Sequence, residues 1–299
     1  MRTEKPEIIL ITIYDFVEDF LKNIVKELKF CLEKPSKNNP PNKKSKLSLS
    51  EILTLWIFKF FSWQSNWKSF YNFIKNYHTK DFPILPNYQN FKNWINKISF
   101  LSLILLKFFM KVFRKNTSIE SLKFVDSSKL EVCRIKREFS HKVAKRIANK
   151  SKSSMWWFYW FKLHIICNEV MEILNFRITS WNIDDRKWLD MIWDNIFWMI
   201  IADAWYVWKK WQEKAKENWK HLFTAVKANM KKLMTKFQHN LLKMRQRVEI
   251  VFSVLKHRMG METSLPRSEI WYFSHYILCL TAYQFKKIFQ NTYIIKKLV

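Results

Sequence analysis

The stretch MIIADAWYVWKK, Met199–Lys210, decides the fold. Its short apolar run contains β-branched isoleucines and predicts a buried strand that ends at Asp203. After a turn-like AWYVW, the segment KKWQEKAKEN predicts a helix over Lys209–Asn218. A carboxylate at the end of such a strand lies at the mouth of a sheet, where α/β proteins place their chemistry. Asp203 is therefore a candidate functional residue.

The turn after Asp203 lacks the glycine that a sharp strand-to-helix turn favours. Glycine reaches positive φ without strain, but Trp205 and Trp208 stand here. The whole chain has 1 Gly and 16 Trp in 299 residues, whereas average usage gives about twenty Gly in this length. Trp also follows Ser62 and Ser180. We hypothesise that UGA codons read here as Trp encode Gly in the source organism; a genuinely Trp-rich protein is the alternative.

The segments around this stretch predict a mixed α/β core. LKFVD predicts a strand ending at Asp126, and SSKLEVCRI continues it or forms the next strand. Two β-rich runs joined by a short polar turn predict a hairpin. The predicted elements that follow the basic insert are hairpin strands in FYWFKLHIICN and EILNFRITSW, a helix in NIDDRKWLDMIWDNI, the strand MIIAD, a strand in HLFTAV, a helix over about Leu241–Arg258 and a C-terminal helix over Glu269–Phe289.

The N-terminal third predicts helices. Residues 1–33 are amphipathic at helical spacing and precede a basic, Pro-containing linker, Lys34–Lys46. Ser48 and Glu51 have the spacing of a capping box. Further helices are predicted over Ile52–Phe61, from after a turn at Trp63–Asn66 through Tyr77, over Asn90–Ile98 and over Leu101–Phe113. These short helices suit a helix-turn-helix-like DNA-binding domain or a plain bundle. We expect a helical region over 1–118 and a catalytic domain over 119–299.

The chain is strongly basic, with 53 Lys and Arg against 25 Asp and Glu, a net charge of +28. Such an excess predicts a polyanionic partner, nucleic acid or an anionic membrane surface. The longest apolar run, Ser99–Phe113, is interrupted by Lys107 and Lys111 and is shorter than the ~20 residues of a membrane span. No signal peptide is recognisable. Four scattered cysteines without a CxxC pair (Cys31, Cys133, Cys167 and Cys279) suit reduced thiols in a cytoplasmic protein and do not favour a zinc site.

Three carboxylates stand out by position: Asp126, Asp203 and Glu249, the last on the late predicted helix. If the two strands are neighbours, their carboxylates converge, and clustered carboxylates repel one another unless divalent cations bind. Each residue also has a simpler interpretation. Asp126 would cap a turn, Asp203 would cap the next helix, and Glu249 would be a surface residue paired with Arg245.

Basic residues accompany these carboxylates. Arg245, Glu249 and Lys256 fall on one stripe of a regular helix at ~100° per residue, which suits holding a metal while clamping phosphates or, alternatively, a solvated salt-bridge stripe. The insert HKVAKRIANKSKSS is the densest basic segment beside the predicted catalytic strand. Its candidate phosphate contacts are Lys142, Lys145, Arg146, Lys150 and Lys152.

With Trp read as Gly, several segments resemble the DDE transposases of bacterial insertion sequences, and most closely insertion-sequence family nine-eight-two. They are FVDSSKLEVC, FSHKVAKRIANKSKSSM, FYGFKLHIICN, EILNFRITSGNIDDRK and ADAGYVGKK. The resemblance covers nearly the whole chain. It implies an RNase H-like catalytic domain with a mixed sheet, dependence on two Mg²⁺ ions with Mn²⁺ as a substitute, cleavage at transposon ends and strand transfer into target DNA.

The resemblance also implies roles for single residues. Asp126, Asp203 and Glu249 match the metal-binding Asp, Asp and Glu of the family. Arg245 and Lys256 match the spacing of a Tyr–Arg–Glu–Lys pattern, whose Tyr position is Leu242 here. Asp184 and Asp185 match a loop that we interpret as structural or DNA-proximal.

The resemblance further implies partners and a location. The expected partners are the terminal inverted repeats of the transposon and target DNA. We expect a homodimer or larger assembly on DNA, and a nucleoid-associated protein in the bacterial cytoplasm. Two alternatives stay open: a DNA-binding relic without activity, and a structure-specific or RNase H-type nuclease.

Overall fold

The computed structural model describes residues 6–32, 47–64, 66–118, 120–134, 149–152, 157–180, 199–203, 221–224, 235–262 and 268–290. The chain divides into two compact units. One contains residues 1–106 and 270–286, and the other contains residues 107–269 and 287–299. The two long helices α5 (Ile95–Asn116) and α10 (Glu269–Gln290) each run from one unit into the other. The expected domain boundary between residues 118 and 119 stays a prediction.

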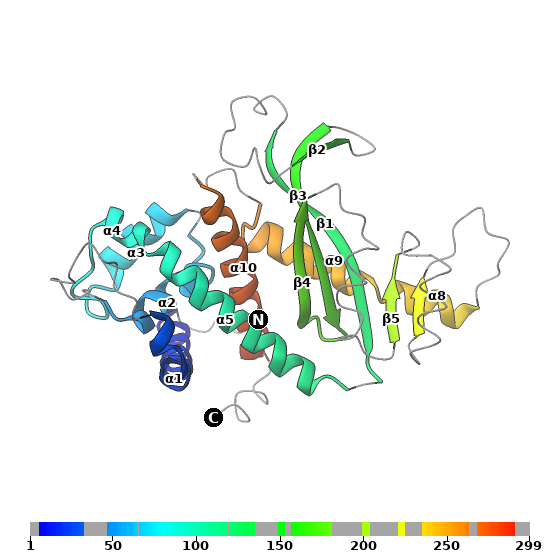
Figure 1. The fold of residues 1–299 in the computed structure, drawn as a ribbon, viewed down its shortest axis with the longest axis horizontal. Coiled ribbons are helices and arrows are strands. Elements are labelled where there is room, and N and C mark those ends of the chain that lie inside the picture. Colours follow the sequence, from blue (N-terminus) through cyan, green and yellow to red (C-terminus); the bar gives the residue numbers. More distant parts are fainter. Residues whose placement is uncertain are drawn as a thin grey trace. The chain divides into compact units, whose positions relative to one another are not determined.

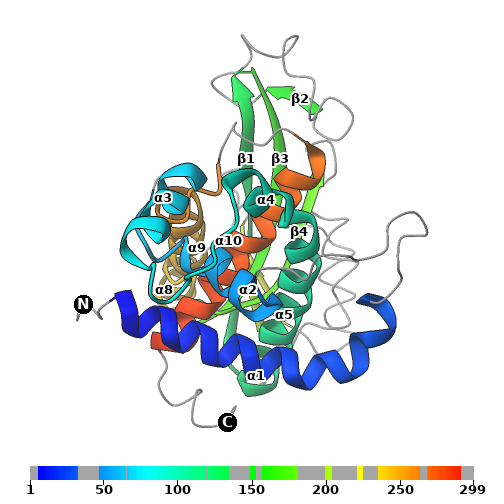
Figure 2. The same cartoon turned by 90° about the vertical axis from the view of Figure 1, so that its left-hand side faces the viewer.

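The first unit is helical. Besides the parts of α5 and α10, it contains α1 (Pro6–Leu32), α2 (Leu49–Phe58), α3 (Trp67–Tyr77) and α4 (Tyr88–Asn93). α1 is the long dark-blue helix of Figure 2, and α2 packs against it. The core of this unit is aromatic: the buried Trp56 lies with its ring centroid 5.6 Å from that of Phe91 and 4.0 Å from that of Trp67.

Local sequence determines where these helices begin. The predicted capping box is confirmed, because the Glu51 N–H donates to Ser48 Oγ at 3.1 Å and the Ser48 N–H donates to a Glu51 carboxylate oxygen at 2.6 Å. The Asn66 and Asn87 side chains cap α3 and α4 by accepting the N–H groups of Ser69 and Asn90.

The predicted break between helices near Ser99 is wrong. The chain breaks earlier, at Trp94, and α5 runs without interruption from Ile95. The reason is that the buried positions continue at helical spacing from Ile98 through Leu101, Leu105 and Phe109. α2 and α3 are separated by residues 59–66, which is longer than the three- or four-residue turn of a helix-turn-helix motif. This connection favours the plain helical bundle.

The second unit contains a six-stranded mixed sheet (Figure 1). The strands are β1 (Leu122–Arg134), β2 (Asn149–Lys152), β3 (Trp157–Asn168), β4 (Ile173–Ser180), β5 (Met199–Ala202) and β6 (His221–Thr224). Their order is β2-β3-β1-β5-β6, and β4 also pairs with β3. β3 is antiparallel to β1, β2 and β4, whereas β1, β5 and β6 are mutually parallel. The predicted hairpin and the strands MIIA and HLFT are confirmed.

Of the two possibilities left open for SSKLEVCRI, the structure shows a prolonged strand, so β1 does not end at Asp126. It continues as one strand to Arg134, because residues beyond Asp126 keep their pairing with β3, for example Ser127 with His164. Pairing with β5 ends earlier, at Phe124 with Ile201. Asp126 therefore lies inside a long strand, just past the point where β1 loses the partner on its other side.

The start of β1 is fixed by polar contacts. The buried Lys123 donates from Nζ to the carbonyl oxygens of Ser118 at 2.8 Å and Ser121 at 2.7 Å. The Leu122 N–H donates to Glu169 Oε1 at 2.9 Å. Burial lowers the pKa of Lys123 to about 8, an effect that Glu169 opposes. The Lys123 bonds hold the start of β1 to the segment that follows α5. The Glu169 bond holds it to the turn that joins β3 and β4.

The single late helix expected over Leu241–Arg258 consists of three pieces. They are α8 (Lys236–Lys243), α9 (Gln246–Ser253) and the π-helical turn η4 (Val254–Arg258). Between α8 and α9 the backbone forms i→i−3 hydrogen bonds, such as the one from the Arg245 N–H to the Leu242 carbonyl at 3.1 Å. α9 packs against β1 and β3, and its residues Val248, Val251 and Phe252 are buried.

Two findings concern the chain more widely. In the described part of the chain, no helix is long and apolar enough to cross a membrane. Cys167 and Cys279 are buried thiols that form no disulfide in the described part of the chain, and burial raises the pKa of both.

Candidate active site

Asp126 and Asp203 occupy equivalent places on neighbouring parallel strands. The last paired residues of β1 and β5 are Phe124 and Ile201, and each aspartate follows two residues further along its own strand. Adjacent strands lie about 4.8 Å apart and side chains alternate between faces, so the two carboxylates belong to one face and one end of the β1–β5 pair. The convergence expected from the sequence thus follows from the register.

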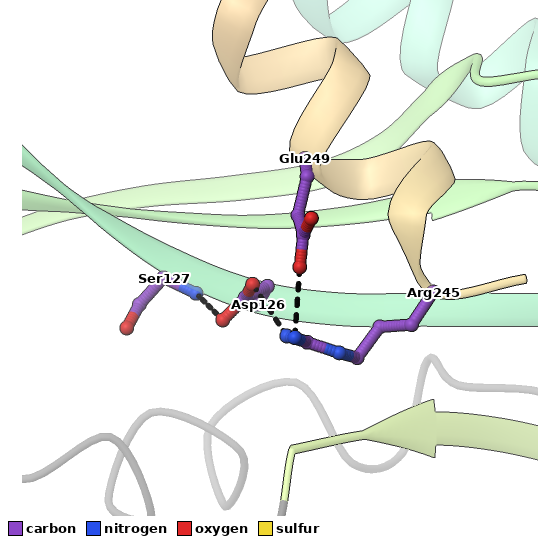
Figure 3. Close-up of polar contacts among 4 residues, drawn as sticks. All are labelled: Asp126, Ser127, Arg245 and Glu249. Atoms are coloured by element: carbon purple, nitrogen blue, oxygen red, sulfur yellow. Dashed lines mark hydrogen bonds and ion pairs between the residues drawn. The ribbon is translucent and has the colours of Figure 1, made fainter. Parts of the chain in front are cut away.

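The guanidinium of Arg245 joins Asp126 to Glu249 (Figure 3). Its NH1 donates to Asp126 Oδ2 and its NH2 to Glu249 Oε1, both at 2.8 Å. Arg245 is the residue at which α9 begins, so the start of this helix reaches β1. The second oxygen of Asp126, Oδ1, accepts the backbone N–H of Ser127 at 2.8 Å. Both carboxylate oxygens of Asp126 therefore have a donor.

The i,i+4 pair between Arg245 and Glu249 is the contact expected from the simpler interpretation of Glu249. It does not make Glu249 an isolated surface residue, because the same guanidinium also binds Asp126. The Glu249 side chain is 51% exposed and that of Asp126 is 18% exposed. Glu249 therefore faces solvent at the rim, and Asp126 lies deeper.

Electrostatics connect all three carboxylates. Burial raises the pKa of Asp126 to about 6, from an ordinary value of 3.8. The Arg245 guanidinium and the Ser127 N–H oppose this rise, whereas the negative charges of Asp203 and Glu249 add to it. Ionisation of Asp126 is thus less favourable here than in water, even with its arginine partner. An additional positive charge at this place would stabilise the ionised form.

The donor chemistry of this cluster fits a magnesium-type ion, which prefers carboxylate oxygens. Arg245 already places positive charge between Asp126 and Glu249, where such an ion would be attracted. As the described side chains stand, however, no three His, Cys, Asp or Glu residues are close enough together to hold a metal ion. A metal would need Arg245 to move away and Glu249 to approach.

Lys256 is not on a continuation of the regular α9 helix. It lies in the π-helical η4, so the ~100° spacing behind the predicted stripe does not reach it. Its Nζ pairs with Glu262 Oε1 at 3.0 Å, and the same oxygen accepts the backbone N–H of Glu131 at 3.5 Å. Gly260, with a φ of 62°, lies between these partners and takes the left-handed conformation that often follows a helix. Lys256 therefore ties η4 toward β1.

Two contributions to the site were missed from the sequence. The Arg247 guanidinium carbon lies 5.7 Å from the centroid of the Phe124 ring, a cation–π contact between α9 and β1 two residues before Glu249. Glu262 partners Lys256 from a loop. The RxR spacing of Arg245 and Arg247 was a usable signal for the first contribution, whereas a lone glutamate in a loop gave none for the second.

Several predicted residues lie outside the described part of the chain. They are Lys142, Lys145, Arg146, Asp184, Asp185, Trp205 and Trp208. Lys150 and Lys152 lie on β2, which pairs with the outer part of β3. The predicted helices over Lys209–Asn218 and within residues 182–196 also fall outside it.

Residues 116–269 match the model of the transposase DDE domain family. The match spans just over half of the 299 residues, and the chain belongs to this family. Asp126, Asp203 and Glu249 all lie within the matched segment. Membership implies an RNase H-like fold, with which the mixed sheet agrees, and DNA as a partner. Comparisons with curated proteins and with solved structures give no match.

Proposed function

We propose that this protein is a DNA transposase that cleaves DNA at transposon ends and transfers the strands into target DNA, with Mg²⁺ as cofactor and Mn²⁺ as a substitute. One observation carries the proposal: within a DDE domain, Asp126 and Glu249 share one guanidinium, and the charge of Asp203 acts on Asp126. A carboxylate within β1 whose pKa is raised by a carboxylate just past β5 and by another on α9 supports a divalent-metal site at this place.

In this proposal Asp126, Asp203 and Glu249 hold the metal. When bound, Mg²⁺ would activate a water or a 3′-OH and stabilise the leaving oxygen of the phosphodiester. The protein's part is to fix the ligands. Asp126 is held inside β1 and by the Ser127 N–H, and Glu249 is carried by α9, which is packed on the sheet. Placement on a strand and a packed helix gives a more precise site than loops do.

The basic residues near these carboxylates are the proposed DNA contacts. Arg245 and Lys256 accompany Glu249 on the α9–η4 segment. The insert supplies Lys142, Lys145, Arg146, Lys150 and Lys152. A net charge of +28 supports phosphate contacts of this kind.

We assign recognition of the terminal repeats to the helical unit. α3 begins with a side-chain cap at Asn66 and exposes Lys68 and Lys75, so a basic helix is available for the DNA backbone. On DNA we expect a homodimer or a larger assembly, because a transposon has two ends to bring together.

The closest affiliation we propose is insertion-sequence family nine-eight-two, with UGA encoding glycine. Trp63 supports the glycine part, because its φ is 58° and its side chain is 87% exposed. Glycine takes this backbone conformation at no steric cost. Trp160 lends no such support: it is buried in the extended β3, with the Lys129 ammonium 5.2 Å from its ring centroid.

A nicking assay on the DNA that flanks the reading frame tests this function. The full chain is incubated with duplexes that carry the inverted repeats and with scrambled duplexes, with Mg²⁺ or with EDTA. We expect Mg²⁺-dependent nicking at the repeat ends, followed by joined products. Equal nicking of the scrambled duplex would identify a nuclease, binding without nicking would identify an inactive relic, and nicking that survives Asp203→Ala would refute the assigned site.

A further inference from the structure

We propose that Arg245 is a resident cation: it holds Asp126 and Glu249 together before a divalent cation enters, and it must release both carboxylates for that cation to bind. The inference rests on the proposed metal site and adds a role for a residue otherwise assigned only to DNA contact. In this role Arg245 is a positioning residue that acts through the two carboxylates.

The first argument is that both carboxylate oxygens of Asp126 already accept a hydrogen bond. Its Oδ1 accepts the Ser127 N–H and its Oδ2 accepts Arg245 NH1, each at 2.8 Å. The Ser127 donor belongs to the backbone of β1 and stays in place. An incoming cation at Oδ2 therefore meets the positive charge of the Arg245 guanidinium, and the guanidinium and the metal compete for this oxygen.

The second argument is the reach of the same guanidinium. NH2 of Arg245 binds Glu249 at 2.8 Å while NH1 binds Asp126. Without it, two carboxylates from different elements would face one another with no cation between them and would repel. Arg245 thus keeps α9 against β1 while no metal is bound, and a metal ion would take over this function on binding.

The third argument is that the Arg245 guanidinium can leave the two carboxylates and turn toward solvent. The Arg245 side chain is 24% exposed and its partner Glu249 is 51% exposed, so the guanidinium can turn toward solvent without leaving a closed core. Arg245 stands at the beginning of α9, at the edge of the packed helix. A released guanidinium would find its next anionic partner in a DNA phosphate. Metal entry would therefore make a DNA contact available.

Metal affinity, measured by calorimetry with MnCl₂ or MgCl₂ on the full chain at one pH, tests the inference. The test variant is Arg245→Gln. The matched control is Arg258→Gln, which removes the same charge from an exposed position of η4. We expect Arg245→Gln to bind the metal about tenfold more tightly than the control, because a charge-assisted competitor has been removed. Equal or weaker binding than in the control would overturn the inference.

A second measurement, of melting temperature, tests whether Arg245 holds the two elements together in the metal-free protein. In EDTA, Arg245→Gln should melt at a lower temperature than Arg258→Gln, and saturating metal should remove most of that difference. Arg245→Lys, which keeps the charge but cannot bridge two carboxylates in the same planar manner, should give an intermediate metal affinity. A variant that melts like the control in EDTA would show that Arg245 does not hold the two elements together.

Asp126→Asn separates failure of this inference from failure of the proposed function. If Asp126→Asn keeps the metal affinity of the unaltered protein, the assigned metal site is wrong. If it loses metal binding while Arg245→Gln behaves like Arg258→Gln, the metal site stands and the resident-cation role falls.

Discussion

Arg245 and Asp126, 119 residues apart in the chain, form an ion pair of 2.8 Å between the beginning of α9 and the interior of β1. The pair lies beside the point where β1 loses its β5 partner. It is therefore placed at the open end of the β1–β5 register, where Asp203 also lies. A contact at this place links the late helix to the strands that carry the two aspartates.

We predict that Asp126→Asn stabilises the protein in EDTA at neutral pH. The pKa of Asp126 is about 6 in the folded chain and 3.8 ordinarily. Between about pH 4 and 6 the unfolded chain has lost this proton and the folded chain has kept it, so stability falls as pH rises through this window and stays lower above it. A difference of this size corresponds to at most about 3 kcal/mol, and the amide has no charge to bury.

Urea unfolding in EDTA at pH 4 and pH 7 measures this effect. Asp126→Asn should show a smaller loss of stability between the two pH values than the unaltered chain. Glu120→Gln, at an exposed position, serves as a control and should leave the loss unchanged. The idea fails if Asp126→Asn and the unaltered chain lose the same stability over this range.

We predict that Asp203→Asn strongly slows nicking without weakening the fold. Its loss should lower the rate by roughly two to three orders of magnitude, as removal of a group that stabilises developing charge does. Asp203 raises the pKa of Asp126, so its neutralisation relieves repulsion and the metal-free protein should melt no lower than before. Circular dichroism and the nicking assay on the same preparation measure both quantities. A marked loss of melting temperature would instead assign Asp203 a structural role.

The sequence was informative where a local pattern decides the structure. The apolar run before Asp203, the alternating runs of the β3–β4 hairpin and the Ser48–Glu51 capping box each specify their own element, and all three are present. The sequence segments that resemble DDE transposases also indicated the family, which the match of residues 116–269 to the DDE domain confirms.

The sequence was less informative where the structure depends on contacts between segments that are far apart in the chain. The end of β1 depends on β3, which continues to pair beyond Asp126, so the sequence alone left open whether SSKLEVCRI prolongs the strand or begins another. The late helix changes to a π-turn at Val254, which moves Lys256 toward Glu262. The bridge from Arg245 to Asp126 joins elements whose contact is not encoded in the spacing of either.

We predict that the basic insert contributes to DNA affinity mainly through phosphate contacts. Each phosphate contact adds about 0.9 to the slope of log affinity against log salt. Replacing Lys142, Lys145 and Arg146 by Gln should therefore reduce the slope by about 2 to 3, with little change in the preference for repeat over scrambled DNA. Fluorescence anisotropy across a salt series measures the slope.

The matched control for the insert removes three lysines from exposed positions of α5. These are Lys107, Lys111 and Lys115. The control should change the slope by less than the insert variant. Equal changes would mean that overall charge, and not the insert, determines affinity.

Our last prediction concerns the glycine hypothesis. Trp63 has a φ of 58° and an 87% exposed side chain. A non-glycine residue in this conformation costs about 1–2 kcal/mol, and an exposed indole regains little of it by packing. Trp63→Gly should therefore stabilise the helical unit by about 0.5–1 kcal/mol, after allowance for the greater freedom of glycine in the unfolded chain. Thermal melting measures the shift, expected at a few degrees.

Trp56→Gly is the matched control, because it makes the same substitution in the same unit. Trp56 is fully buried and stacked against Phe91, so its removal should cost about 3–5 kcal/mol. Opposite signs at the two positions would mean that the fold requires tryptophan at 56 and glycine at 63. Mass spectrometry of the protein from its own organism then decides which residue is inserted at 63. A native peptide with intact Trp63, or a Trp63→Gly variant less stable than the unaltered chain, would refute the glycine assignment at this position.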